Sequence, residues 1–152
     1  MSRGDFTPAY GLRTCVIERF QTKAGQTAIL AGEPVIQDTS GDVEYVQAPG
    51  ANITTSDVFA GIAVTNDTVT STADGEVFLA VPSAATVFKA TAKTKANLAT
   101  TVILTKVVID FTTPAYTVDE STTTNGLCLI LKYDSTTGEI WFLIDMTEAI
   151  NA

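Results

Sequence analysis

The sequence predicts an all-β fold: a single compact β-barrel, β-tulip-like or sandwich domain with an extended N-terminal arm. Short runs of β-branched and aromatic residues alternate with turn-forming residues about every 8–12 positions, which is typical of sandwiches and barrels. No segment has the apolar spacing of a helix longer than one turn. The 152 residues suffice for one domain with a real core. We therefore expect an arm at residues 1–13 and a β-barrel domain at residues 14–152.

The clearest strand signal is a hairpin near the C-terminus, within residues 125–145. Residues 127–133 and 139–145 are rich in aliphatic and aromatic side chains, which suit a pleated sheet. Asp, Ser and Thr residues and Gly138 separate the two runs, and such residues favour a turn because Gly accepts a positive φ.

We expect a specific register for this hairpin, although a slip of one residue would exchange its two faces. The predicted opposite pairs are Leu131 with Ile140, Leu129 with Phe142, and Lys132 with Glu139. The reverse face is apolar as well and carries Cys128, Ile130, Trp141 and Leu143. A hairpin that is apolar on both sides needs cover on both sides, from another sheet or from a neighbouring chain.

The remaining elements are predicted from the same signals, taken in chain order. Residues 1–13 show no periodicity, so they form an arm that is ordered only if something holds it. Apolar or alternating runs between turn clusters predict strands at residues 14–20, 27–31, 34–37, 43–47, 58–64, 76–81 and 86–92. A long β-branched run at 100–111 predicts a strand that bends near Lys106, and residues 117–125 read as a polar loop. Residues 146–150 form one helical turn or a frayed end.

The residue content argues against catalysis, and we expect no enzyme, catalytic residue, cofactor or metal. There is no histidine, which removes the commonest general base and the commonest ligand of catalytic zinc. There is no Cys-x-x-Cys pair and no glycine-rich phosphate loop ahead of a helix. Four acidic residues could offer oxygen ligands to a cation, but their spacing matches no calcium loop, so turn formation explains them better: Asp38, Asp42, Asp119 and Glu120.

Charge and hydropathy limit the partners. The net charge of −8 argues against binding nucleic acid and favours solubility at high concentration. No stretch approaches the roughly 20 apolar residues that span a bilayer, and the N-terminus lacks the apolar core of a secretion signal. Without an export signal, Cys15 and Cys128 are expected to be buried free thiols.

Residues 58–93, with the phrases FAGIA and GEVFLAV followed by Pro82, resemble the head-decoration (cement) proteins of tailed bacteriophages. Residues 31–35 and the closing hairpin extend this resemblance. It implies a β-barrel or β-tulip that binds the outside of the expanded capsid and bridges subunits of the major capsid protein. It also implies a homotrimer located on the capsid exterior of the virion, with no direct contact to nucleic acid or membrane.

The resemblance further implies that the N-terminal arm reaches onto the shell. Aromatic and arginine side chains often provide the binding energy of an interface. The candidate capsid-binding residues in the arm are Arg3, Phe6, Tyr10 and Arg13.

Two other functions remain open. One is a β-barrel domain of a phage tail or baseplate, although the chain shows no heptads or fibrous repeats. The other is a carbohydrate-binding β-sandwich, because sugar sites usually stack on aromatic rings. The available aromatic residues are Trp141, Tyr133, Tyr116 and Tyr45, but Trp141 lies in the densest apolar run and so suits a core or an interface.

Overall fold

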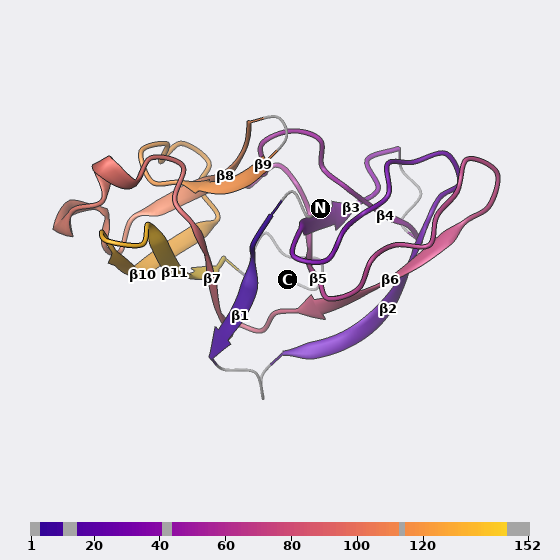
Figure 1. Cartoon of the computed structure of the whole chain (residues 1–152), viewed down its shortest axis with the longest axis horizontal. Helices are drawn as coiled ribbons and strands as arrows, with labels where there is room; N and C mark the ends of the chain where they lie inside the picture. The colour runs from indigo at the N-terminus through magenta and orange to yellow at the C-terminus, as the bar shows by residue number, and fades with distance from the viewer. Residues whose placement is uncertain (1–3, 11–14, 41–43, 113–114, 146–152) are drawn as a thin grey trace.

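The protein is all-β, as predicted, and its described residues form two antiparallel sheets and two single turns of 3-10 helix. The computed structural model describes residues 4–10, 15–40, 44–112 and 115–145. The two sheets lie side by side along the long axis of the molecule, with β1 between them (Figure 1). The predicted helical turn at residues 146–150 lies outside the described residues.

The first sheet has six strands in the order β1-β7-β11-β10-β8-β9. Their bounds are β1 Thr7–Tyr10, β7 Val87–Thr91, β11 Glu139–Ile144, β10 Cys128–Asp134, β8 Lys106–Thr112 and β9 Ala115–Asp119. The sheet curls so far that the chain just after β7 meets β9. The Lys93 amide there donates a hydrogen bond of 2.8 Å to the Val118 carbonyl. The curl encloses one half of the core.

The second sheet has five strands in the order β2-β6-β5-β3-β4. Their bounds are β2 Val16–Thr22, β6 Gly75–Val81, β5 Phe59–Ala63, β3 Pro34–Gln37 and β4 Val46–Gln47. This sheet curls too, since Gln21 of β2 forms an isolated bridge with Tyr45 next to β4. In Figure 1, β2 and β6 run together along the outer side of the molecule.

A shared core holds the two sheets together in one unit. The larger apolar cluster includes Phe59 and Ile62 from the five-stranded sheet and Phe88, Ile130 and Phe142 from the six-stranded sheet. A smaller cluster lies against the five-stranded sheet and contains Ile29, Val35, Val46, Ala60, Ala63, Val77 and Leu79. Burial of both clusters is the main driving force for the fold.

Several predicted strands were placed wrongly. Residues 27–31 form no strand, and residues 100–105 begin with the 3-10 turn η3 (Thr100–Val102), which follows η2 (Lys95–Asn97). Strand β9 extends into the start of the polar loop that we predicted at residues 117–125, because buried Tyr116 and Val118 alternate with more polar neighbours. Such short alternation within a polar stretch gives little signal in the sequence.

The closing hairpin forms as predicted, but its register was wrong. Ile130 lies opposite Phe142, and Tyr133 lies opposite Ile140. A β-bulge at Leu131 puts an extra residue into β10, so Lys132 pairs with Trp141 and not with Glu139. The inward side chains of the hairpin are therefore Cys128, Ile130, Ile140, Phe142 and Ile144, all of them buried.

The described part of the N-terminal segment belongs to the folded domain. Thr7–Tyr10 pair with β7, and the Phe6 amide donates to the Gly32 carbonyl at 3.1 Å. Asp5 accepts hydrogen bonds from the amide and the hydroxyl of Thr91. The chain's own sheet therefore holds residues 4–10 in place, and this stretch is not an extended arm.

Candidate functional site

The outer side of the β10–β11 hairpin carries apolar side chains that lie outside both core clusters. We call Leu129, Leu131, Trp141 and Leu143 the outer hairpin face. All four side chains are partly accessible to solvent. Their outward direction follows from the alternation of side chains along β10 and β11, because the buried residues between them in the sequence point into the core. The described residues therefore leave this face incompletely covered.

Lysines border the outer hairpin face. Trp141 pairs with Lys132 on one side and with Lys89 on the other, and Leu129 pairs with Lys106. The ammonium groups of Lys89 and Lys106 also reach carboxylates, at 3.7 Å to Glu139 and 2.7 Å to Asp145 respectively. The result is an apolar stripe with a charged rim, which is the usual composition of a protein interface.

A hollow of about 530 Å³ opens at the turn end of the hairpin. We call it the aromatic hollow, and its lining residues are Ile103, Lys132, Tyr133, Asp134, Ser135 and Trp141. The Lys132 ammonium lies over the Trp141 ring, 4.6 Å from its centroid, in a cation–π contact. Backbone hydrogen bonds from Thr136 and Thr137 hold the pKa of Asp134 below its ordinary value, so this carboxylate is ionised at neutral pH.

Leu104 directly follows Ile103, which lines the hollow, and it combines exposure with backbone strain. Its side chain is 68% exposed, and its φ of 63° lies in the left-handed region that leucine rarely adopts. Its amide donates to the Ile130 carbonyl at 2.7 Å, and the Ile130 amide donates to the Thr105 carbonyl at 3.0 Å. These bonds fix the strained conformation. Strain of this kind is found preferentially at functional positions.

We refer to the outer hairpin face, the aromatic hollow and Leu104 together as the apolar face. The sequence predicted that the hairpin would offer apolar side chains on both sides. It did not indicate the strained Leu104, because a positive φ at leucine has no signature in the sequence.

The four aromatic residues considered for sugar binding do not form one site. Trp141 and Tyr133 both line the aromatic hollow. Tyr116 is buried, and its hydroxyl accepts a hydrogen bond of 3.0 Å from the Gly50 amide. The Tyr45 hydroxyl donates to Asp74 at 2.9 Å in the other sheet.

The predicted capsid-binding residues of the arm are also separated. Phe6 is fully buried, with its ring edge-on to Phe142 at 5.8 Å between centroids, so it is a core residue and not a surface anchor. The reason is its position just before β1, which brings the ring over β11. The backbone of Tyr10 pairs with Val87. Arg3 and Arg13 lie outside the described residues.

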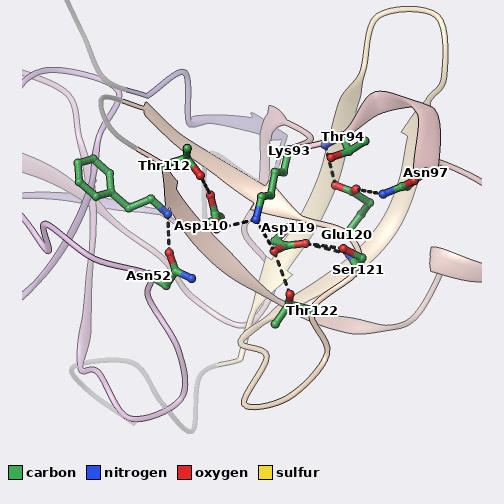
Figure 2. Close-up of polar contacts among 11 residues, drawn as sticks. Asn52, Lys93, Thr94, Asn97, Asp110, Thr112, Asp119, Glu120, Ser121 and Thr122 are labelled. Atoms are coloured by element: carbon green, nitrogen blue, oxygen red, sulfur yellow. Dashed lines mark hydrogen bonds and ion pairs between the residues drawn. The ribbon is translucent and has the colours of Figure 1, made fainter.

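A polar cluster at the ends of β7, β8 and β9 contains two of the acidic residues considered as cation ligands. Figure 2 shows the Lys93 ammonium between the carboxylates of Asp110 and Asp119, at 3.0 and 3.2 Å. Asp119 is only 5% exposed in its side chain, whereas Lys93 is 39% exposed. The cluster thus ties three strands together across the end of the curled sheet.

Hydrogen bonds set the charge state of this cluster. Burial alone would raise the pKa of Asp119, but bonds from Ser121, Thr122 and Lys93 outweigh it, and the pKa lies below the ordinary value. Hydrogen bonds to Asp110 and Asp119 raise the pKa of Lys93. Lys93 and Asp119 are therefore both charged at neutral pH, and together with Asp110 they form a hydrogen-bonded network that stabilises the fold.

The other acidic candidates likewise serve the local fold. Glu120 accepts bonds from the Thr94 amide at 3.2 Å and from Asn97 at 2.9 Å, and Figure 2 shows both. Asp38 accepts a bond of 2.6 Å from the Ser40 amide, which is turn formation as expected. Asp42 lies outside the described residues. In the part of the chain that the structure describes, no three ligand-type side chains form a group able to hold a metal.

The two cysteines are free thiols. Cys128 is fully buried, and burial raises the pKa of its thiol. Cys15 is partly exposed, so the expectation of a buried thiol holds for Cys128 alone.

Among residues 4–145 with their gaps, no helix is long and apolar enough to cross a bilayer. A scan against protein-family models and searches of curated proteins and of solved structures gave no match to this chain. The functional argument therefore depends on the surface described above.

Proposed function

We propose that the chain is a structural virion protein that binds the outer surface of a phage capsid. In this role it stabilises the expanded head by bridging subunits of the major capsid protein. The observation that supports the proposal best is the apolar face: three leucines, a tryptophan and a strained exposed leucine, bordered by lysines.

The composition of the apolar face suits a protein partner. Interfaces typically combine an apolar centre with a polar rim, and tryptophan is among the residues that most often contribute a large share of the binding energy. The strained backbone of Leu104 directs its side chain into solvent. This arrangement does not stabilise a free monomer, so it is better explained by contact with a partner. Contact with a shell protein would bury this side chain and offset the strain.

The described polar groups fit a structural role. No buried side-chain nitrogen or oxygen in the described residues lacks a hydrogen-bond partner. The buried carboxylates of Asp110 and Asp119 pair with the Lys93 ammonium, and Asp119 also accepts hydrogen bonds from hydroxyl and amide donors. We propose no catalytic role for this cluster.

The direct test is co-sedimentation of the full chain with expanded and with unexpanded shells of the phage that encodes it. We expect saturable binding to the expanded shells, together with a rise in the temperature at which these shells disrupt. A chain that stays in the supernatant at all shell concentrations would contradict the proposal.

We also propose that the chain acts as a homotrimer on the shell. Closed cyclic symmetry would cover apolar surface that a single copy leaves exposed. Cryo-electron microscopy of decorated shells should show three copies around each occupied position. Isolated single copies at every position would contradict the trimer.

Carbohydrate binding is the second candidate, because Trp141 and Tyr133 share one hollow with Lys132, Asp134 and Ser135. A sugar ring could stack on the indole while its hydroxyls bond to the polar lining. A glycan array tests this: binding that is lost in Trp141→Ala and kept in Tyr45→Ala would support it. An array without any signal would exclude it for the sugars present.

A further inference from the structure

Strand β2 forms the outer edge of the five-stranded sheet. It pairs with β6 over all seven residues, from Val16–Val81 to Thr22–Gly75, without a bulge. On its other side, the described residues supply one bridge, between Gln21 and Tyr45. Residues 16–20 therefore present a regular row of backbone donors and acceptors without a strand beside it in the described chain. We call this row the β2 slot.

The side chains of the β2 slot are exposed on both faces of the sheet. Val16 and Ile17 are each 52% exposed, and consecutive residues of a strand point to opposite faces. Glu18 is exposed, and Arg19 forms an ion pair of 3.1 Å with Glu76 on the neighbouring strand. An apolar edge of this kind readily pairs with another strand.

Proteins usually protect such an edge with a proline, a bulge, charged side chains (lysine above all) or a covering segment. Residues 16–22 contain no proline and no lysine, and their pairing with β6 is regular. The slot also has a defined end, because the bridge at Gln21 closes it. Its charged residues are Glu18 and Arg19, and Arg19 is already paired with Glu76. A regular, bounded edge without the other protecting features fits a strand-binding site.

We propose that the β2 slot binds an extended segment of the major capsid protein, which adds a sixth strand to the sheet. This inference rests on the proposed function and names the contact through which the shell is held. The backbone of the segment would bond to residues 16–20, and aliphatic side chains would lie opposite Val16 and Ile17. A lysine or arginine opposite Glu18 would complete the match.

A second copy of this chain fits the slot less well. If two slots paired antiparallel with full overlap, Glu18 would face Glu18 of the second copy, and like charges directly opposite each other destabilise a sheet. This charge pattern favours a segment of a different polypeptide as the occupant.

Hydrogen–deuterium exchange of the full chain, free and bound to expanded shells, tests the inference. We expect amide exchange within residues 16–20 to slow by at least about tenfold on binding, because new backbone hydrogen bonds form. Unchanged exchange in this segment on shells that do bind the chain would overturn the inference. Slow exchange in the free protein that depends on its concentration would also overturn it, since a second copy would then fill the slot.

Two adjacent proline variants give a matched pair. Neighbouring residues of a strand direct their amides to opposite edges, so Ile17→Pro and Glu18→Pro remove one amide that faces β6 and one that faces the slot. The variant with the higher melting temperature identifies the slot-facing position. We expect that variant to bind shells at least about tenfold more weakly than the wild type. Equal binding by that variant would overturn the inference.

The two proposals fail in different ways. A wild-type chain that does not bind shells contradicts the proposed function and removes this inference with it. A wild-type chain that binds while the slot stays unprotected and the proline variant binds normally contradicts the slot alone.

Discussion

Leu104 adopts a costly backbone conformation without an evident benefit to the isolated chain. Its left-handed backbone is held by the bonds that Leu104 and Thr105 make with Ile130. A left-handed conformation costs a residue with a Cβ roughly 1–2 kcal/mol, and glycine avoids this cost. The side chain that incurs it is mostly in solvent.

We therefore predict that Leu104→Gly stabilises the free protein while it weakens partner binding. The gain in unfolding free energy should be up to about 1 kcal/mol, because removal of strain exceeds the added entropy of glycine in the unfolded chain. Chemical denaturation measures the first effect and co-sedimentation the second. A variant that loses stability would show that the leucine side chain stabilises the fold.

Asp119 makes stability depend on pH. Its pKa is lowered in the folded state, so its ionised form stabilises the protein above the ordinary carboxyl pKa and loses this effect as the pH falls. We predict that Asp119→Asn is less stable than the wild type near pH 7. The difference should shrink as the pH drops below about 4, where the wild-type carboxylate takes up a proton.

Thermal melting of both proteins across pH 2–8 (roughly the range over which carboxyl groups titrate) measures this convergence. Thr70→Ala, in an exposed turn, is a suitable control, since it should leave the pH dependence unchanged. A constant difference between Asp119→Asn and the wild type at every pH would contradict the assigned role of the charge.

At the scale of the element, β1 and the residue before it are part of the fold. Phe6 lies fully buried against Phe142, and Asp5 is bonded to Thr91. We predict that Phe6→Ala lowers the unfolding free energy by about 3–5 kcal/mol, which is the usual cost of removing a buried aromatic ring. Urea denaturation measures this, and a loss below about 1 kcal/mol would mean that Phe6 is a surface residue.

The hairpin shows how far the sequence determines an element. Its two strands and turn could be predicted from composition, because apolar runs flank a polar stretch that ends in Gly138. Its register could not, because both faces are apolar and either assignment satisfies the pattern. The bulge at Leu131 sets the register, and the position of a bulge depends on contacts with the rest of the sheet.

The candidate site, too, could be predicted only in part from the sequence. The surplus of apolar residues in the hairpin was evident from the sequence, and Trp141 was recognised as a core or interface residue. The hollow could not be foreseen, since it forms only where Ile103, far away in sequence, meets Tyr133 and Trp141. The β2 slot depends on strand order, which no local pattern encodes.

At the scale of the whole molecule, two curled sheets share one core and leave two kinds of surface that we propose as contact sites. The apolar face on the six-stranded sheet offers side chains, whereas the β2 slot on the five-stranded sheet offers backbone. The two surfaces belong to different sheets, an arrangement that suits a protein that bridges subunits.

The most direct measurement compares the affinity of Leu104→Asp and Val58→Asp for expanded shells. Both replace an exposed aliphatic side chain, but Leu104 belongs to the apolar face, and Val58 precedes β5 in the other sheet. Aspartate tolerates a left-handed backbone, so Leu104→Asp should fold. We predict that Leu104→Asp binds at least about thirtyfold more weakly, because an unpaired charge enters a desolvated contact, and that Val58→Asp binds like the wild type. Equal affinity of Leu104→Asp and the wild type would contradict the claim that the apolar face is the contact surface.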